Sequence, residues 1–281
     1  MASRSSRRTD WSAEARDKAR LLDEERQRRS GRLIKWGVVA AAAVIAAVIA
    51  LIVVNSLRGQ VSDTGPAPRH GNEYGGITLL SETELAGTGT GGIDTASLPE
   101  ETAPPGEVPP GVAPAAAGEP IPVVSYVDVN CVFCAAFEAK YTDELRAWLD
   151  AGDITLEYRT VAFLDRNSTT DYSSRGAGAL ACVADSSPAR YLEFTGALYT
   201  NFESGELDDD GLAALAEGVG AGDISACLSD NTFRPWVDYT TQAAELSGIS
   251  GTPTVYVDGQ EVPDAVEDFA TVMQDELSAR G

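Results

Sequence analysis

One stretch, residues 123–134, constrains the fold of this chain more than any other. Its sequence, VVSYVDVNCVFC, begins with β-branched and aromatic residues that predict a buried strand over Val123–Val129. Cys131-x-x-Cys134 follows at once and leads into a helical pattern that Gly152 is expected to end. Side chains on one face of that helix recur at three- and four-residue steps: Cys134, Phe137, Tyr141, Leu145 and Trp148. The two cysteines are therefore predicted at a strand-to-helix junction.

The predicted place of Cys131, at the helix N-terminus, gives it a distinct chemistry. Unpaired backbone amides and the positive end of the helix dipole favour a thiolate over a thiol at such a position. We therefore expect the pKa of Cys131 to lie below the free value of about 8.5. Cys134, one turn further along the apolar face, is expected to be shielded. A thiolate close to a second cysteine is the minimal requirement for thiol–disulfide exchange.

Charge is spread unevenly along the 281 residues. The formal net charge is −22, but residues 1–35 hold 11 Lys and Arg against 6 Asp and Glu, whereas the remainder holds 10 against 37. The acidic body argues against nucleic acid as the partner, because phosphate binding needs clustered Lys and Arg. We interpret residues 1–35 as a solvated basic tail.

An uninterrupted apolar run of 19 residues, Trp36–Val54, follows this tail. At about 1.5 Å per residue, a helix of this length matches the hydrocarbon core of a bilayer. The rival interpretation is a cleavable signal peptide, which usually has a shorter apolar stretch and a small-residue cleavage site. We favour an uncleaved transmembrane helix over residues 36–54. The basic residues 1–35 would then stay in the cytoplasm, and everything after Asn55 would lie outside the cell membrane.

Residues 55–119 have the composition of a tether. They are rich in Gly, Pro, Ala and Thr, which is typical of a flexible or extended linker. One more apolar island, residues 73–80, interrupts this composition with the sequence EYGGITLL. It is either a first strand that docks on the folded domain or a sticky patch in the linker, and the sequence leaves both alternatives open.

Residues 120–281 show the pattern of one globular domain. Ile154–Val161 predicts a second strand, and Thr254–Val257 with the turn Asp258-Gly259 predicts a hairpin. The helical patterns lie between these strands and at the C-terminus: Tyr172–Asp185, Pro188–Asn201, Asp208–Val219, Phe233–Leu246 and Val266–Leu277. Strand, helix, strand, helical insertion, hairpin and helix is an α/β arrangement with an insertion in the middle.

These features together resemble the thioredoxin fold in its DsbA-like form, and more specifically the membrane-tethered bacterial DsbA-like oxidoreductases. The resemblance rests on Cys131-x-x-Cys134 after a strand, on the helical insertion, and on Thr252-Pro253 before the final hairpin, and it covers about residues 120–281. It implies that Cys131 is the exposed attacking thiol and Cys134 the buried resolving thiol. It also implies that Pro253 is cis and that the backbone before it holds the substrate chain.

Two positions depart from the family pattern. The family often has Pro after the first cysteine and a polar residue such as His before the second, whereas this chain has Val132 and Phe133, which we expect to contact substrate. Many relatives carry an acid six positions before the first cysteine; here that position is Ser125, and the nearest acid is Asp128. Without the His, the Cys131 thiolate loses a source of stabilisation. We therefore expect its pKa to lie well above the roughly 3.5 of DsbA, and the pair to be less oxidising than about −120 mV.

Cys182 and Cys227 complete the cysteine count, and both lie in the helical insertion. Four cysteines outside the reducing cytoplasm indicate two disulfides, for which three pairings exist. We expect Cys182 to pair with Cys227 as a structural bridge. The alternatives are two buried free thiols and a zinc site made from all four cysteines, although a second close-spaced pair is lacking for zinc.

The expected function is an extracytoplasmic thiol–disulfide oxidoreductase that introduces disulfides into exported proteins through Cys131 and Cys134. Its expected partners are exported proteins with free thiols or disulfides, and the chemistry needs no metal or organic cofactor. The family suggests reoxidation by a DsbB-like or vitamin K epoxide reductase-like membrane protein. The alternatives are a disulfide reductase or isomerase, and a thioredoxin-like binding module with only structural disulfides. The single histidine, His70, lies in the expected tether, which argues against a Ser-His-Asp or Cys-His hydrolase.

Overall fold

The computed structural model of this chain describes residues 18, 20, 43–49, 61–87, 94–95, 97, 103–104 and 106–280. The chain divides into two compact units, Met1–Gln60 and Val61–Gly281. In the first unit, residues 43–49 form a helix, and most of the expected basic tail and of the expected span over residues 36–54 lies outside the described residues. Within the described part of the chain, none of the helices combines the length and the apolar character needed to cross a bilayer.

The second unit is built on a mixed sheet of five strands in the order β1-β3-β2-β4-β5. The central strands β2 and β3 are parallel, and the other pairs are antiparallel. The strands span Ile77–Leu79 (β1), Ile121–Val127 (β2), Ile154–Thr160 (β3), Thr254–Val257 (β4) and Gln260–Glu261 (β5). The strands expected around residues 123–129 and 154–161 and the expected hairpin are therefore present.

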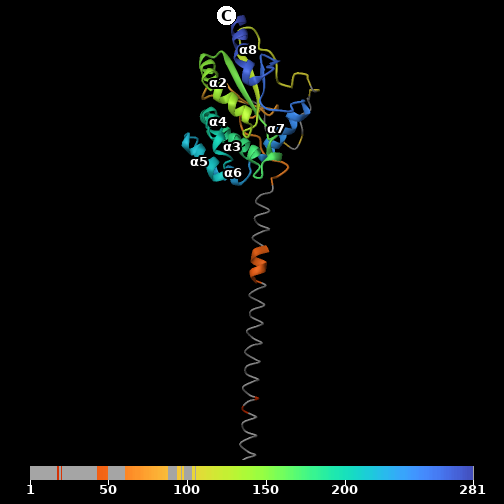
Figure 1. The fold of residues 1–281 in the computed structure, drawn as a ribbon, viewed down its shortest axis with the longest axis vertical. Helices are drawn as coiled ribbons and strands as arrows, with labels where there is room; N and C mark the ends of the chain where they lie inside the picture. The colour runs from red at the N-terminus through yellow and green to blue at the C-terminus, as the bar shows by residue number, and fades with distance from the viewer. Residues whose placement is uncertain are drawn as a thin grey trace, which may run out of the picture. The chain divides into compact units, whose positions relative to one another are not determined.

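Seven α-helices accompany this sheet among the described residues of the second unit (Figure 1). They span Val132–Ala151 (α2), Tyr172–Ser186 (α3), Tyr191–Thr200 (α4), Asp209–Gly218 (α5), Ser225–Ser229 (α6), Arg234–Leu246 (α7) and Ala265–Arg280 (α8). The order confirms the expected α/β arrangement with a helical insertion between β3 and β4. The short helix α6 lies around Cys227, within the expected helical insertion, although its bounds were not predicted.

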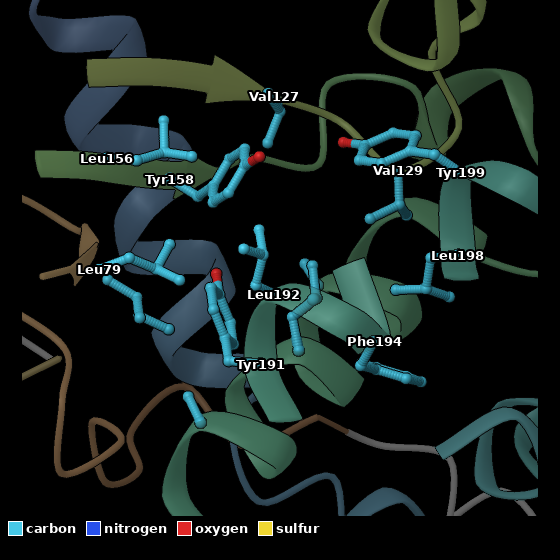
Figure 2. Close-up of a cluster of buried hydrophobic side chains, with 14 of the residues drawn as sticks. Leu79, Val127, Val129, Leu156, Tyr158, Tyr191, Leu192, Phe194, Leu198 and Tyr199 are labelled. Atoms are coloured by element: carbon cyan, nitrogen blue, oxygen red, sulfur yellow. The ribbon is translucent and has the colours of Figure 1, made fainter. Parts of the chain in front are cut away.

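The larger core lies on the face of the sheet that α2, α4 and α8 cover. Alternate residues of β2 and β3 point into it, as the period of two in a strand requires. Figure 2 shows Leu156 and Tyr158 of β3 facing Tyr191 and Leu192 of α4. Beside them, the aromatic rings of α2 and α8 stack edge to face, with the ring centroids of Phe137 and Phe269 5.0 Å apart. The helix that carries the two cysteines is thus fixed on a rigid core.

The opposite face of the sheet carries a smaller cluster with α7. It comprises Val112, Val124, Tyr126, Val161, Phe163, Ala244, Ile249 and Tyr256. Behind it, the guanidinium group of Arg159 is buried and donates to the Glu157 carboxylate at 2.6 Å and to the Tyr126 hydroxyl at 2.8 Å. Burial of an arginine is tolerated there because a charge partner and hydrogen-bond acceptors come with it.

The N-terminal part of the expected tether is in fact part of the domain. Residues 61–87 are described, and strand β1 within them pairs with β3, with Ile77 opposite Tyr158 and Leu79 opposite Leu156. Leu79 is fully buried, and Leu85 is nearly so. The expectation of a linker over this stretch was therefore wrong, and of the two alternatives for residues 73–80 the docked strand is the one present. The composition misled because a few buried apolar side chains are enough to dock a Gly-rich segment.

The docked strand yields a matched pair of substitutions. Leu79→Ala removes a fully buried side chain, so we expect the free energy of unfolding to fall by about 2–5 kcal/mol. Leu80→Ala changes the next residue, which is 43% exposed, and should leave stability within about 0.5 kcal/mol. Denaturant unfolding of both variants measures the difference. Equal stability of the two variants would return residues 73–80 to the role of linker.

Candidate active site

The pairing of β2 with β4 assembles the site from two distant segments. Cys131 follows the end of β2 and precedes the first residue of α2, and Thr252-Pro253 precedes β4. The register places Tyr126 opposite Thr254, so the two segments meet at the same edge of the sheet. The bond between Thr252 and Pro253 is cis, as the resemblance implied. The structure therefore brings together the cysteine pair and the Thr-Pro pair, which are 121 residues apart.

Cys131 lies against the loop that contains Thr252. Its Sγ donates to the Thr252 carbonyl oxygen at 3.2 Å, and the residue has extended backbone angles as the N-cap of α2. Only 6% of Cys131 is exposed, so the attacking thiol is less open than the resemblance implied. The Thr252 carbonyl lies against one side of the sulfur and reduces its exposure. Both Cys131 and Cys134 are free thiols in this structure.

Hydrogen bonding lowers the pKa of Cys131 to about 6. The largest cause is the hydrogen bond with the Cys134 thiol, followed by those with Thr252 and with the backbone amides of Cys134 and Phe133; burial opposes them. Amides at the start of α2 stabilise the thiolate, as expected for a helix N-terminus. The value lies between the free thiol and the extreme of DsbA, in agreement with the expectation from the sequence.

The pKa of Cys134 is shifted in the opposite direction. It is completely buried on the core face of α2, and burial is the first reason why its pKa is raised well above the usual range. The neighbouring Cys131 raises it further. The two thiols thus differ strongly: one forms a thiolate near neutral pH, and the other stays protonated and shielded. This asymmetry is what a two-cysteine exchange reaction needs.

The two residues between the cysteines face solvent. Val132 is 57% exposed and Phe133 is 63% exposed, and the neighbouring Thr252 and Pro253 are partly exposed. These four residues form an apolar rim around Cys131. Exposed large apolar side chains beside a reactive group are typical of a binding surface for another chain.

Two buried acids flank the cysteine pair. Asp128, the first residue after β2, is fully buried, and burial is the main reason why its pKa is raised to about 6. Glu138, one turn beyond Cys134, accepts a hydrogen bond from the Tyr158 hydroxyl at 2.7 Å, and burial raises its pKa to about 7. The sequence did not indicate that Glu138 is buried, because a glutamate in an amphipathic helix usually faces solvent. A signal was available in its place on the apolar face, four residues after Cys134.

The remaining cysteines form the expected bridge. Cys182 of α3 and Cys227 of α6 are joined by a disulfide that spans 45 residues, with their Cα atoms 6.1 Å apart. This bond contradicts both alternatives, the two free thiols and the four-cysteine zinc site. It ties α6 to α3 in the helical insertion. Asp208–Asp210 likewise has a structural role in the described contacts, because Asp208 caps α5 through the Gly211 amide at 2.9 Å.

Comparison with known proteins places this geometry in a family context. A family model described as thioredoxin matches residues 116–275. The search of curated proteins found no significant match. Among the solved structures that share the fold are three bacterial proteins. MdbA, a thiol–disulfide oxidoreductase from Actinomyces oris, is 22% identical with a TM-score of 0.53, covering 74% of this chain and 92% of that one.

The other two structures extend the likeness to further bacteria. The reduced form of the disulfide bond oxidoreductase DsbG from Mycobacterium tuberculosis is 26% identical with a TM-score of 0.50, covering 62% of this chain and 90% of that one. Oxidised BdbD from Bacillus subtilis is 20% identical with a TM-score of 0.52, covering 63% of this chain and all of that one. The similarity thus extends over nearly the whole length of each of these proteins.

The asymmetry of the two thiols predicts how they react with an alkylating reagent. In the reduced protein, the alkylation rate of Cys131 should rise with pH through about 6 and level off above it, because only the thiolate reacts. Cys134 should react slowly over the same range, since it is buried and protonated. Timed alkylation of the reduced protein with both thiols in place, followed by peptide mass spectrometry, separates the two rates, because Cys134→Ser would remove the thiol that lowers the Cys131 pKa most. Faster modification of Cys134 would contradict this assignment.

Proposed function

Because this chain belongs to the thioredoxin family and is a thiol–disulfide oxidoreductase of the DsbA type, we propose that it introduces disulfides into exported proteins through Cys131 and Cys134. The observation that carries the proposal is the place of the Cys131 sulfur, 3.2 Å from the Thr252 carbonyl oxygen, within an apolar rim. A substrate chain lying on this rim would bring its cysteine to Cys131. The backbone before Pro253 would hold that chain.

The proposed reaction uses the difference between the two thiols. A substrate thiolate attacks Cys131 of the disulfide form, a mixed disulfide forms there, and Cys134 leaves and takes up a proton. A second substrate thiolate then attacks the substrate sulfur of this bond and releases Cys131 as a thiolate. Its lowered pKa makes Cys131 a good leaving group and favours the reduced enzyme, which is the property of an oxidant. The reduced pair would be reoxidised by a DsbB-like or vitamin K epoxide reductase-like membrane protein.

A second candidate direction has its own support. The buried Asp128 places a negative group near Cys131, and the apolar Val132 and Phe133 add no stabilisation of a thiolate. Both features lower the oxidising strength of the Cys131–Cys134 pair and favour a reductase or isomerase. The equilibrium of the pair with glutathione separates the directions, because a strong oxidant stays reduced in buffers where a reductase is already oxidised.

Trapping of reaction intermediates tests the exchange itself. Cys134→Ser removes the resolving thiol, so mixed disulfides between Cys131 and exported proteins should accumulate and run as reducible adducts on gels. Cys131→Ser, the matched control, should give none, because Cys134 is fully buried. If neither variant forms adducts in intact cells, the domain is a binding module and not an exchange enzyme.

We further propose that residues 36–54 anchor the protein in the cell membrane as a single span, with residues 1–35 in the cytoplasm and the acidic domain outside. The support is the 19-residue apolar run preceded by 11 basic residues. Protease added outside intact cells should degrade the acidic domain and spare residues 1–35. If the protease degrades the acidic domain only after the cells are lysed, the proposed orientation is wrong.

A further inference from the structure

Asp128 is a fully buried acid that takes no part in the bond changes of the exchange reaction. It follows β2 directly and precedes Cys131 by three residues. Isolated carboxylates are rarely buried, because removal of a charge from water is costly unless partners compensate for it. The partners of Asp128 therefore indicate what it does.

The carboxylate of Asp128 joins three segments around the redox pair. Oδ1 accepts the Asn130 amide at 2.8 Å and the Ser173 hydroxyl at 2.6 Å, and Oδ2 accepts the Leu164 amide at 2.9 Å. Its backbone carbonyl accepts the Cys131 amide at 3.1 Å. The loop before Cys131, the loop after β3 and the first turn of α3 are thus held by one side chain.

All the partners of this carboxylate are neutral. The groups that face it and can carry charge are Cys131, ahead of α2, and Tyr199 of α4, both of which become negative when they ionise. Arg175 of α3, two residues after Ser173, is bound instead to Asp209 at 3.1 Å. Among the described residues, the ion pairs of the domain do not include Asp128.

We propose that Asp128 is a positioning residue of the redox pair, which holds the loop before Cys131 in place and, by its charge, opposes the Cys131 thiolate and so limits the oxidising strength of the pair. The inference deepens the proposed function and rests on it.

The sign of the effect follows from the reaction. Two substrate thiolates and one proton convert the Cys131–Cys134 disulfide into a Cys131 thiolate and a Cys134 thiol, while the substrate gains one disulfide. The two electrons thus leave the substrate sulfurs and reside on the enzyme, with a net negative charge on Cys131. An ionised Asp128 nearby destabilises this reduced state and leaves the uncharged disulfide unaffected. Loss of the Asp128 charge should therefore make the pair more oxidising.

The two groups titrate in the same range of pH, which makes the interaction measurable. Burial raises the pKa of Asp128 to about 6, and the charge on Cys131 contributes to this rise. The pKa of Cys131 is lowered to about 6. When two groups interact strongly, each titration curve is broadened and reports both. Ionisation of Asp128 as pH rises should thus hold back the ionisation of Cys131.

The test is Asp128→Asn in the reduced full-length protein, with the alkylation rate of Cys131 measured from pH 4 to 9. A nearby like charge typically shifts a pKa by about one unit, so the midpoint of the Cys131 alkylation curve should fall by as much as about one pH unit, a factor of up to about ten in the ionisation constant. The change should be largest above pH 6, where Asp128 is ionised. The equilibrium with glutathione should move toward the reduced pair by a similar factor. The titration curve should also narrow to that of a single group.

Two further variants keep the test decisive. Glu206→Gln neutralises an exposed acid that contacts the same loop through the Asn130 amide group at 3.1 Å, and it should leave the Cys131 titration unchanged. Ser173→Ala removes one donor to Asp128, which raises the pKa of that carboxyl and should lower the pKa of Cys131 by less than Asp128→Asn does. If Asp128→Asn fails to fold, Ser173→Ala takes its place as the test.

The outcomes are distinct from those that test the oxidase proposal, because alkylation requires no substrate and no direction of exchange. A lowered Cys131 pKa in Asp128→Asn, or in Ser173→Ala if the former does not fold, supports the role. An unchanged or raised Cys131 pKa in the folded variants overturns it. An equal shift in Glu206→Gln also overturns it, because the effect would then belong to the acidic surface in general.

Discussion

The antiparallel register between β2 and β4 is the constraint on which the rest of the site depends. Val123 and Val257 pair on the larger core face, and Val124 and Tyr256 pair on the other. A slip by one residue would turn every one of these side chains to the wrong face, so the register is strongly fixed. The position of Thr252 relative to Cys131 is fixed with it. Core packing far from the thiols thus sets the geometry of exchange.

The parts of the site that could be predicted from the sequence are those with a local signal. A strand, a CxxC and an amphipathic helix follow one another within about thirty residues. Each can be identified from its own residues, without knowledge of the segments that pack against it. The hydrogen bonds of Asp128 have no such signal. Its acceptor oxygens are bound by Leu164 and Ser173, which lie 36 and 45 residues further along the chain. Only the parallel pairing of β2 and β3 brings them to it.

The docking of β1 shows why composition alone misjudged the N-terminal segment. Glycine lowers the apolar content of a segment, but it also permits close contact with a neighbour. A Cβ at Gly76 would clash with the Glu157 carboxylate, and one at Gly71 would lie 2.8 Å from the Trp236 ring. These glycines therefore admit the segment to the surface of the sheet and of α7. The glycine content of this segment, which is typical of a linker, is therefore explained by its close packing against the domain.

Two opposing short-range effects determine the stability of the Cys131 thiolate. The Cys134 thiol and the amides at the start of α2 stabilise the Cys131 thiolate. In the role proposed for it, Asp128 opposes the thiolate, since the charge on Cys131 in turn raises the pKa of Asp128. The domain carries many other acids, yet most of them face solvent, where water and salt screen interactions beyond about 10 Å at 0.1 M ionic strength. A buried carboxylate three residues from the thiol is screened far less. One aspartate can therefore weigh more on the reactivity of Cys131 than the large negative charge of the surface.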